Sequence, residues 1–237
     1  MNTQEKMNPK KTARVAGLLY LLIAIFGIFS MLYGPESLIV IGDAGATAKN
    51  IEAYKTMYRF AFMGDLLGQV IFIFLVLLLY KLLKSVNKKQ AVLMVVLVLV
   101  GVPIALLNDI NQIAALMIAS GVGNLGVFMV DQLQAHVMLF LDLYQVGLHI
   151  AFIFWGLWLF PLSYLVFKSG FLPRILGILL IIAGIGYLFE FFIFFLLPDL
   201  EITIRMFTFW GEVLLALWLL IMGVNVEKWE ELALESA

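Results

Sequence analysis

The chain has 237 residues, of which 64% are hydrophobic and only 13% are charged, and its mean hydropathy is +1.06. A soluble domain is about half apolar and about a quarter charged, so this composition excludes a water-soluble globular protein of this size. The formal net charge of -1 argues against a nucleic-acid partner. The absence of cysteine excludes disulfides and thiolate metal sites. The composition predicts an integral membrane protein.

Six apolar segments are long enough to cross a bilayer, which takes about 20 helical residues. These predicted spans lie at 14–33, 56–80, 91–118, 135–167, 174–197 and 206–224. They form a transmembrane domain, 14–224, between an N-terminal tail, 1–13, and a C-terminal tail, 225–237. Pro103 and Pro161 fall inside the third and fourth spans, where neighbouring helices make a kink tolerable. The predicted fold is an all-α polytopic membrane bundle of six transmembrane helices.

Basic residues set the predicted orientation in the bilayer. With the N-terminus inside, most of the Lys and Arg residues fall in cytoplasmic segments: Lys6, Lys10, Lys11, Arg14, Lys81, Lys84, Lys88, Lys89, Lys168, Arg174 and Lys228. The opposite side keeps Lys49, Lys55, Arg59 and Arg205. The positive-inside rule therefore predicts that both termini are cytoplasmic in a multi-pass protein of the cell membrane.

Of the connections expected on the outer side, the two longest lie at 37–50 and 121–134. The first contains a glycine-rich turn in which Asp43 could serve as a cap or line the mouth of a pocket. This turn lacks the Gly-Lys-Ser/Thr ending of a phosphate-binding loop. On the cytoplasmic side, 227–237 is expected to form a short interfacial turn anchored by Trp229.

Ionisable side chains inside the predicted spans are the main functional signal: Asp65, Asp109, Asp142, His149, Glu190 and Glu212. A charged side chain near the bilayer centre costs about 2.5–3.5 kcal/mol on insertion scales, so these groups must face one another, water or a ligand. Measured at the helical rise of about 1.5 Å per residue, all six fall outward of the midpoints of their spans. We expect one polar pocket near mid-membrane that opens toward the outer side.

Amide side chains share helix faces with these ionisable groups: Gln69, Asn108, Gln112 and Gln145. At about 100° per residue, Asp142, Gln145 and His149 fall on one narrow stripe of the fourth span. The six ionisable and four amide side chains together form the expected ligand-binding site.

The ligand of this site stays open at the level of sequence. An anionic pocket with aromatic neighbours fits a cation, which could be a proton, a metal ion or a lipophilic amine, and the cation could also be translocated. Alternatively, Glu190 and Glu212 would serve as an acid pair in a membrane enzyme that acts on a lipid or an isoprenoid. In a third reading the chain is a non-catalytic sensor or assembly subunit, whose polar groups only hold helices together.

Metal and cofactor chemistry receives little support from the sequence. His149 has only one other histidine in the chain, His136, thirteen residues earlier, whereas a zinc site takes three or four protein ligands. We expect no catalytic residue and no cofactor. The partners expected are the lipid bilayer and a small cationic ligand, and the oligomeric state is undetermined by sequence.

Stretches spread over nearly the whole chain carry a family resemblance: ARVAGLLYLL at 13–22, SLIVIGDA at 37–44, TAKNI at 47–51, QLQA at 132–135 and LFLDL at 139–143. The most specific one is KSGFLPRILG at 168–177, which continues to AGIGYL at 183–188. In these stretches the chain resembles the bacterial membrane family catalogued as domain of unknown function 4386. The resemblance implies a multi-span membrane protein with no established activity and no catalytic residue to carry over.

Overall fold

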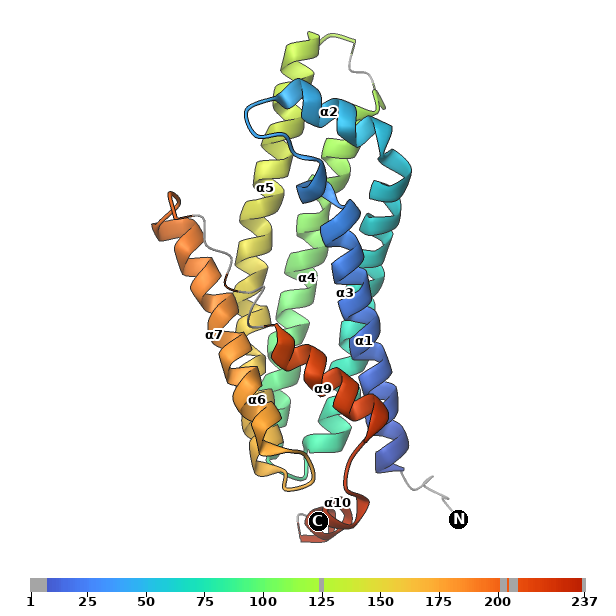
Figure 1. The fold of residues 1–237 in the computed structure, drawn as a ribbon, viewed down its shortest axis with the longest axis vertical. Coiled ribbons are helices and arrows are strands. Elements are labelled where there is room, and N and C mark those ends of the chain that lie inside the picture. The colour runs from blue at the N-terminus through green and yellow to red at the C-terminus, as the bar shows by residue number, and fades with distance from the viewer. Residues whose placement is uncertain (1–7, 124–125, 201–203, 205–208, 236–237) are drawn as a thin grey trace. The chain divides into compact units, whose positions relative to one another are not determined.

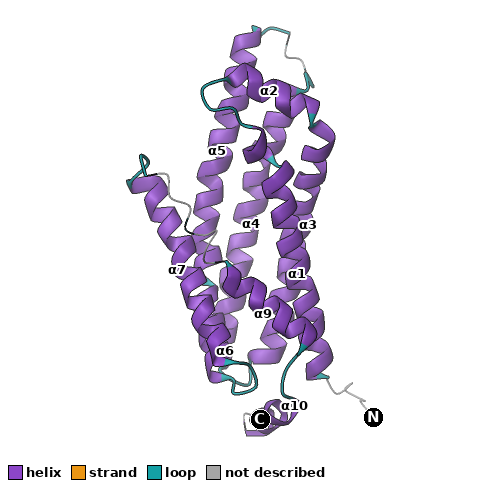
Figure 2. Ribbon diagram, in the orientation of Figure 1, coloured by secondary structure: helices purple, strands orange, loops and turns teal. Residues whose placement is uncertain are grey.

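The computed structural model describes residues 8–123, 126–200, 204 and 209–235. Within these residues the regular structure is entirely helical, with no strand (Figure 2). The helices are α1 (Pro9–Tyr33), the 3-10 helix η1 (Pro35–Leu38), α2 (Ala44–Ala53), α3 (Lys55–Leu83), α4 (Lys88–Ala119), α5 (Val130–Leu157), α6 (Leu159–Lys168), α7 (Arg174–Leu196), α9 (Trp210–Ile221) and α10 (Val226–Glu235).

The described part of the chain has five helical segments that are long and apolar enough to cross a membrane. The number rises to six if α9 and α10, which are bent by 99° relative to each other, count as one span. The predicted fold class, an all-α polytopic membrane bundle, is therefore confirmed. The cytoplasmic placement of the termini stays a prediction.

Helices α1, α3, α4 and α7 coincide in sequence with the first, second, third and fifth predicted spans. Pro173 directly precedes α7, and Gly170 in the preceding turn has a φ of 70°, a left-handed conformation that glycine adopts without steric cost. The start of the sixth predicted span at 206–208, along with Lys6 and Arg205 from the charge count, falls outside the described residues.

The fourth predicted span is divided in two at Trp158, between α5 and α6. Pro161 explains the break, because proline has no N–H for the carbonyl four residues earlier and its ring crowds that carbonyl. Pro103, by contrast, lies inside α4 without ending the helix. The two prolines therefore have different effects, although the sequence placed both inside spans.

The connection at 37–50 is more ordered than the expected loop, since it contains the end of η1 and most of α2. The Asp43 side chain accepts a hydrogen bond from the Ala46 backbone N–H at 2.8 Å and so caps the N-terminus of α2. The capping role considered for Asp43 is confirmed. The sequence did not predict α2 because only Thr47 and Ile51 of this helix are buried, which leaves little apolar periodicity.

Contacts divide the chain into two units, which we describe separately. Unit 1 comprises Met1–Leu22, Ile71–Gly101 and Phe152–Ala237, and unit 2 comprises Ile23–Val70 and Val102–Ala151. The boundaries fall within α1, α3, α4 and α5, all labelled in Figure 1. Each unit therefore draws its helices from several distant parts of the sequence.

In unit 1, α6 packs against α7, and α7 packs against α9. Glycines allow the backbones to approach closely: a Cβ added at Gly156 would lie 2.9 Å from the Gly184 carbonyl oxygen, and one added at Gly17 would lie 2.7 Å from the Ala216 carbonyl oxygen. Small residues at such contacts are typical of helix packing in membranes, where close van der Waals contact replaces the hydrophobic effect.

The two ends of the described chain meet at one end of unit 1. Gly223, just after α9, faces the Lys10 side chain at the start of α1. Helix α10 follows, and its Trp229 indole N–H donates a hydrogen bond to the Leu82 carbonyl oxygen at 2.8 Å. The predicted anchor Trp229 therefore holds a short helix rather than a turn.

The core of unit 2 joins the connecting segment to the long helices. Leu38 of η1 and Ile51 of α2 pack with Tyr58 of α3, Leu116 of α4 and Leu141 of α5. Because Tyr58 and Ile51 are fully buried, α2 is fixed over the helices of unit 2 that carry most of the predicted polar site.

Candidate functional site

Asp65 on α3 connects three helices of unit 2. The Ser30 hydroxyl on α1 donates a hydrogen bond to Asp65 Oδ2 at 2.8 Å. The Gln112 side-chain amide on α4 donates to the same oxygen at 3.4 Å. Hydrogen-bonded carboxyl groups of this kind are a recognised way to join helices in a membrane.

A group of carboxyl side chains surrounds this junction. Asp109, only 6% exposed, lies close enough to Asp65 for the two carboxyl groups to interact electrostatically. The carboxyl group of Glu36 in η1 interacts with Asp65 in the same way. The Tyr144 hydroxyl on α5 is within electrostatic range of all three carboxyl groups. Four segments of unit 2 therefore bring acidic and phenolic groups to one place.

Gln112 is the most enclosed polar side chain of this network. It is 0% exposed, and its side-chain oxygen, Oε1, has no hydrogen-bond partner, nor has Gln69 Oε1. The Tyr58 hydroxyl donates to the Gln112 backbone carbonyl at 2.8 Å, which fixes this turn of α4. A buried amide oxygen without a donor costs free energy, about 1–3 kcal/mol in typical cases.

Asn108 joins α4 to α5 beside these groups. Its side-chain amide donates to the Tyr144 carbonyl oxygen at 2.9 Å, and its own oxygen accepts from the Asn111 amide at 3.3 Å. Asn108 is 7% exposed. The first of these bonds joins α4 to α5, and the second lies within α4.

The predicted stripe on α5 is only partly directed into the network. The Gln145 amide donates to Glu36 Oε1 at 3.0 Å, and the His149 Nδ1–H donates to the Gln145 carbonyl oxygen at 2.8 Å. Asp142, on the same predicted stripe, is exposed. The structure thus links Gln145 to the network through Glu36, whereas this bond of His149 lies within α5, and Asp142 is not brought into the network.

The two glutamates of the predicted site belong to unit 1. Glu212 of α9 accepts a hydrogen bond from the Tyr20 hydroxyl of α1 at 2.6 Å. The centroids of the Tyr20 and Trp158 rings lie 6.0 Å apart. Tyr187 interacts electrostatically with the Tyr20 hydroxyl. Glu190 on α7 is 6% exposed. One pocket that includes both these glutamates and Asp65 stays a prediction.

Three residues of the unit 2 network were missed at the sequence level: Ser30, Glu36 and Tyr144. The search for polar groups covered carboxyl, imidazole and amide side chains within spans, and Glu36 lies just beyond the first predicted span. Its position directly after Pro35, at the end of an apolar helix, is a usable signal because the chain turns back there. Ser30 carries no such signal, since isolated serines are common in membrane helices.

Two hollows of unit 1 stand out among the described residues. One, of about 350 Å³, lies between the start of α1 and the end of α9, and the other, of about 260 Å³, is an apolar hollow on α7 around Phe189. Neither is lined by a predicted site residue. No group of three or more His, Cys, Asp or Glu side chains within the described part of the chain is placed to hold a metal ion.

Comparison with known proteins identifies the family. The family model described as "Domain of unknown function (DUF4386)" matches residues 15–223. A protein of Archaeoglobus fulgidus, described as an uncharacterized protein, is 42% identical over 81 residues, which are 34% of this chain and 49% of that protein. The match therefore spans about half the length of this relative. No solved structure matches the chain. Because the family model extends from the first turns of α1 to the residues just after α9, the chain belongs to the DUF4386 family.

Proposed function

We propose that unit 2 binds an organic ammonium ion at the carboxyl groups of Asp65 and Asp109. The observation that carries this proposal is the nature of their neighbours, which are hydroxyl, amide and other carboxyl groups and not a cationic side chain of the described residues. Carboxyl groups in a membrane span need a counter-charge or a proton. A cation from solution supplies that charge.

The buried amide of Gln112 favours a ligand that carries N–H groups. Its Oε1 atom is an acceptor without a donor, and it belongs to the residue whose amide nitrogen reaches Asp65. A protonated amine has a positive charge for the carboxyl groups and N–H donors for the amide oxygen. A quaternary ammonium ion of similar size has the charge but no donor.

The predicted outer connections support access from outside the cell membrane. Residues 37–50 and 121–134 both belong to unit 2, as do Asp65 and Asp109. In the predicted orientation the network therefore lies in the unit that carries the outer segments. A ligand from outside the cell would reach these carboxyl groups without crossing the bilayer.

Thermal unfolding of the full-length protein in detergent tests this proposal. Hexylamine hydrochloride is the probe, N,N,N-trimethylhexylammonium controls for the N–H donors, and hexanol controls for the alkyl chain. A ligand at a hundredfold its Kd adds about 2.7 kcal/mol to the free energy of unfolding. We expect this stabilisation with hexylamine, binding at least tenfold weaker with the quaternary ion, and no shift with hexanol.

Charge-neutral variants locate the site. Asp65→Asn and Asp109→Asn should each abolish the shift with hexylamine, whereas Asp131→Asn, a change of the same charge at an exposed position of unit 2, should retain it. If both network variants respond to hexylamine as the unsubstituted protein does, the proposal is wrong. Equal or higher stability of these variants without any ligand response would assign the carboxyl groups a purely structural role.

The wider predicted site and translocation have tests of their own. The sequence prediction adds Asp142, His149, Glu190 and Glu212 to the ligand contacts, and Glu212→Gln would then weaken hexylamine binding. An unchanged Kd in that variant restricts the site to unit 2. Movement of a bound cation across the membrane would appear as uptake of labelled guanidinium into proteoliposomes, which Asp65→Asn would abolish.

A further inference from the structure

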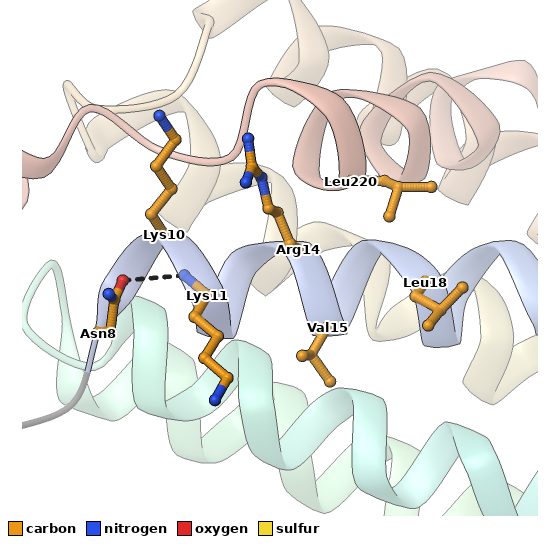
Figure 3. Close-up of a pocket in the computed structure, with 7 residues that line it drawn as sticks. All are labelled: Asn8, Lys10, Lys11, Arg14, Val15, Leu18 and Leu220. Carbon is orange, nitrogen blue, oxygen red and sulfur yellow. Dashed lines mark hydrogen bonds between the residues drawn. The ribbon is translucent and has the colours of Figure 1, made fainter. Parts of the chain in front are cut away.

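The hollow between α1 and α9 in unit 1 has a basic rim. It measures about 350 Å³, within the range of about 300–1,000 Å³ for small-molecule sites. Lys10, Lys11 and Arg14 line it together with Asn8. Figure 3 shows Lys10 and Arg14 along one edge of α1 and Lys11 along the opposite edge, so that the cationic groups flank one face of the helix.

These cations occupy the end of a helix that disfavours positive charge. The N-terminus of a helix carries the positive end of the helix dipole, where anions are stabilising and cations are not. The first turn of α1 has no acidic residue. Arg14 donates one hydrogen bond at 3.5 Å to the Ile221 carbonyl oxygen at the end of α9, where the negative end of that helix dipole compensates part of the charge of Arg14. A bound anion would offset the repulsion.

Apolar side chains form the rest of the lining. Val15 is 39% exposed and Leu18 is 46% exposed, and both line the hollow with Leu220 of α9. They follow the basic turn along α1 in the direction of the predicted span. An inorganic anion would use only the basic rim, whereas an amphiphile with an anionic head would use both parts.

We infer that this hollow binds an anionic phospholipid, with its phosphate between Lys10, Lys11 and Arg14 and an acyl chain along Val15, Leu18 and Leu220. Clusters of Lys and Arg next to a membrane span attract anionic lipids through the surface charge of the bilayer. The hollow adds a defined position for one headgroup. The inference is independent of the ammonium site proposed for unit 2, because it uses none of the same residues.

Native mass spectrometry of the full-length protein from detergent micelles tests the inference. The apparent Kd of the first bound lipid is measured for phosphatidylglycerol and for phosphatidylcholine with the same acyl chains, and then for phosphatidylglycerol with added sodium phosphate. We expect at least tenfold tighter binding of phosphatidylglycerol and little competition by phosphate at 10-fold excess. Equal affinity for the two lipids would overturn the inference, and full displacement by phosphate would make this a site for a free anion.

A second basic cluster of unit 1 provides the matched control. Lys10→Gln/Lys11→Gln/Arg14→Gln removes the rim, and Lys84→Gln/Lys88→Gln/Lys89→Gln removes the same charge from the turn after α3 and the start of α4. We expect the first variant to weaken the binding of phosphatidylglycerol at least tenfold and the second less than twofold. Equal weakening would show that net charge alone attracts the lipid.

A single substitution keeps the inference testable if the rim variant fails to fold. Lys11→Gln alone should weaken binding of phosphatidylglycerol about threefold, because it removes one of three cationic groups. Leu18→Asn should weaken lipid binding without changing the binding of inorganic phosphate. No change in either single variant would contradict the inference.

Discussion

The two units join their helices by different means. In unit 2 a polar network connects α1, α3, α4 and α5, with Asp65 accepting hydrogen bonds from two other helices. In unit 1 the helices approach at glycines, and the contact at Gly17 leaves no room for a side chain against the backbone of α9. Unit 1 also contains the Tyr20–Glu212 hydrogen bond, whose two residues are close in sequence to the contact between Gly17 and α9.

The difference shows which kind of change each unit tolerates. A backbone contact such as the one at Gly17 cannot relax by side-chain rotation, so an added side chain must displace a helix. A hydrogen-bond network loses one bond at a time, about 0.5–1.5 kcal/mol for a neutral pair. Added volume at a glycine contact of unit 1 should therefore cost more stability than the loss of a single hydrogen bond in either unit.

The largest effect is expected from Gly17→Leu in unit 1. A Cβ at this position would lie 2.7 Å from the Ala216 carbonyl oxygen and 2.8 Å from Leu220 Cα, so α9 must move. We expect a loss of about 3 kcal/mol in the free energy of unfolding. It is measured by titration with sodium dodecyl sulfate in mixed micelles and followed by tryptophan fluorescence.

The matched control is Gly27→Leu on the same helix, where an added Cβ meets no atom within 4 Å. It should change the free energy of unfolding by less than about 0.5 kcal/mol. If the two variants lose stability equally, close approach of α1 and α9 does not stabilise unit 1.

An intermediate effect is expected from Tyr20→Phe, which removes the hydroxyl that donates to Glu212 Oε2 at 2.6 Å. Hydrogen bonds to charged groups contribute about 1.5–3 kcal/mol, so we expect a loss of about 2 kcal/mol in the same titration. In a Glu212→Gln background the substitution should cost less, since the acceptor is neutral. Equal losses in both backgrounds would mean that the bond to Glu212 contributes nothing specific.

The smallest effect is expected from Tyr58→Phe in unit 2. Tyr58 is fully buried, and its hydroxyl donates to the Gln112 backbone carbonyl at 2.8 Å. Loss of one neutral hydrogen bond should lower the free energy of unfolding by about 1 kcal/mol. Tyr54→Phe, at a position 56% exposed, should be neutral. A loss at Tyr58 as large as the loss from Gly17→Leu would contradict the expected order, in which added volume in unit 1 costs more than the loss of one hydrogen bond in unit 2.

Part of the polar network could be predicted from the sequence. Asp65, Asp109 and Gln112 are polar residues within apolar spans, and a polar group in a membrane must find a partner. The structure brings these three residues together in unit 2. Glu36 and Ser30 could not be found this way, since neither is an ionisable group inside a predicted span. Their place depends on how the chain folds back after Pro35.

The sequence by itself determined the class of the protein. Long apolar segments require helices in a bilayer, because a helix satisfies its own backbone hydrogen bonds where no water is present. This is why the all-α membrane fold and the approximate positions of α1, α3, α4 and α7 followed from composition and segment length. The resemblance to the DUF4386 family rests on the same linear information.

Only the tertiary structure decided which polar groups meet. Glu212 pairs with Tyr20, which is 192 positions away in the chain, and Asp65 binds Ser30 and Gln112 on two other helices. Helix periodicity gives the face on which a side chain lies, but it does not give the neighbour of that face. Partner choice depends on helix packing, which is set by small residues and shape along the whole interface.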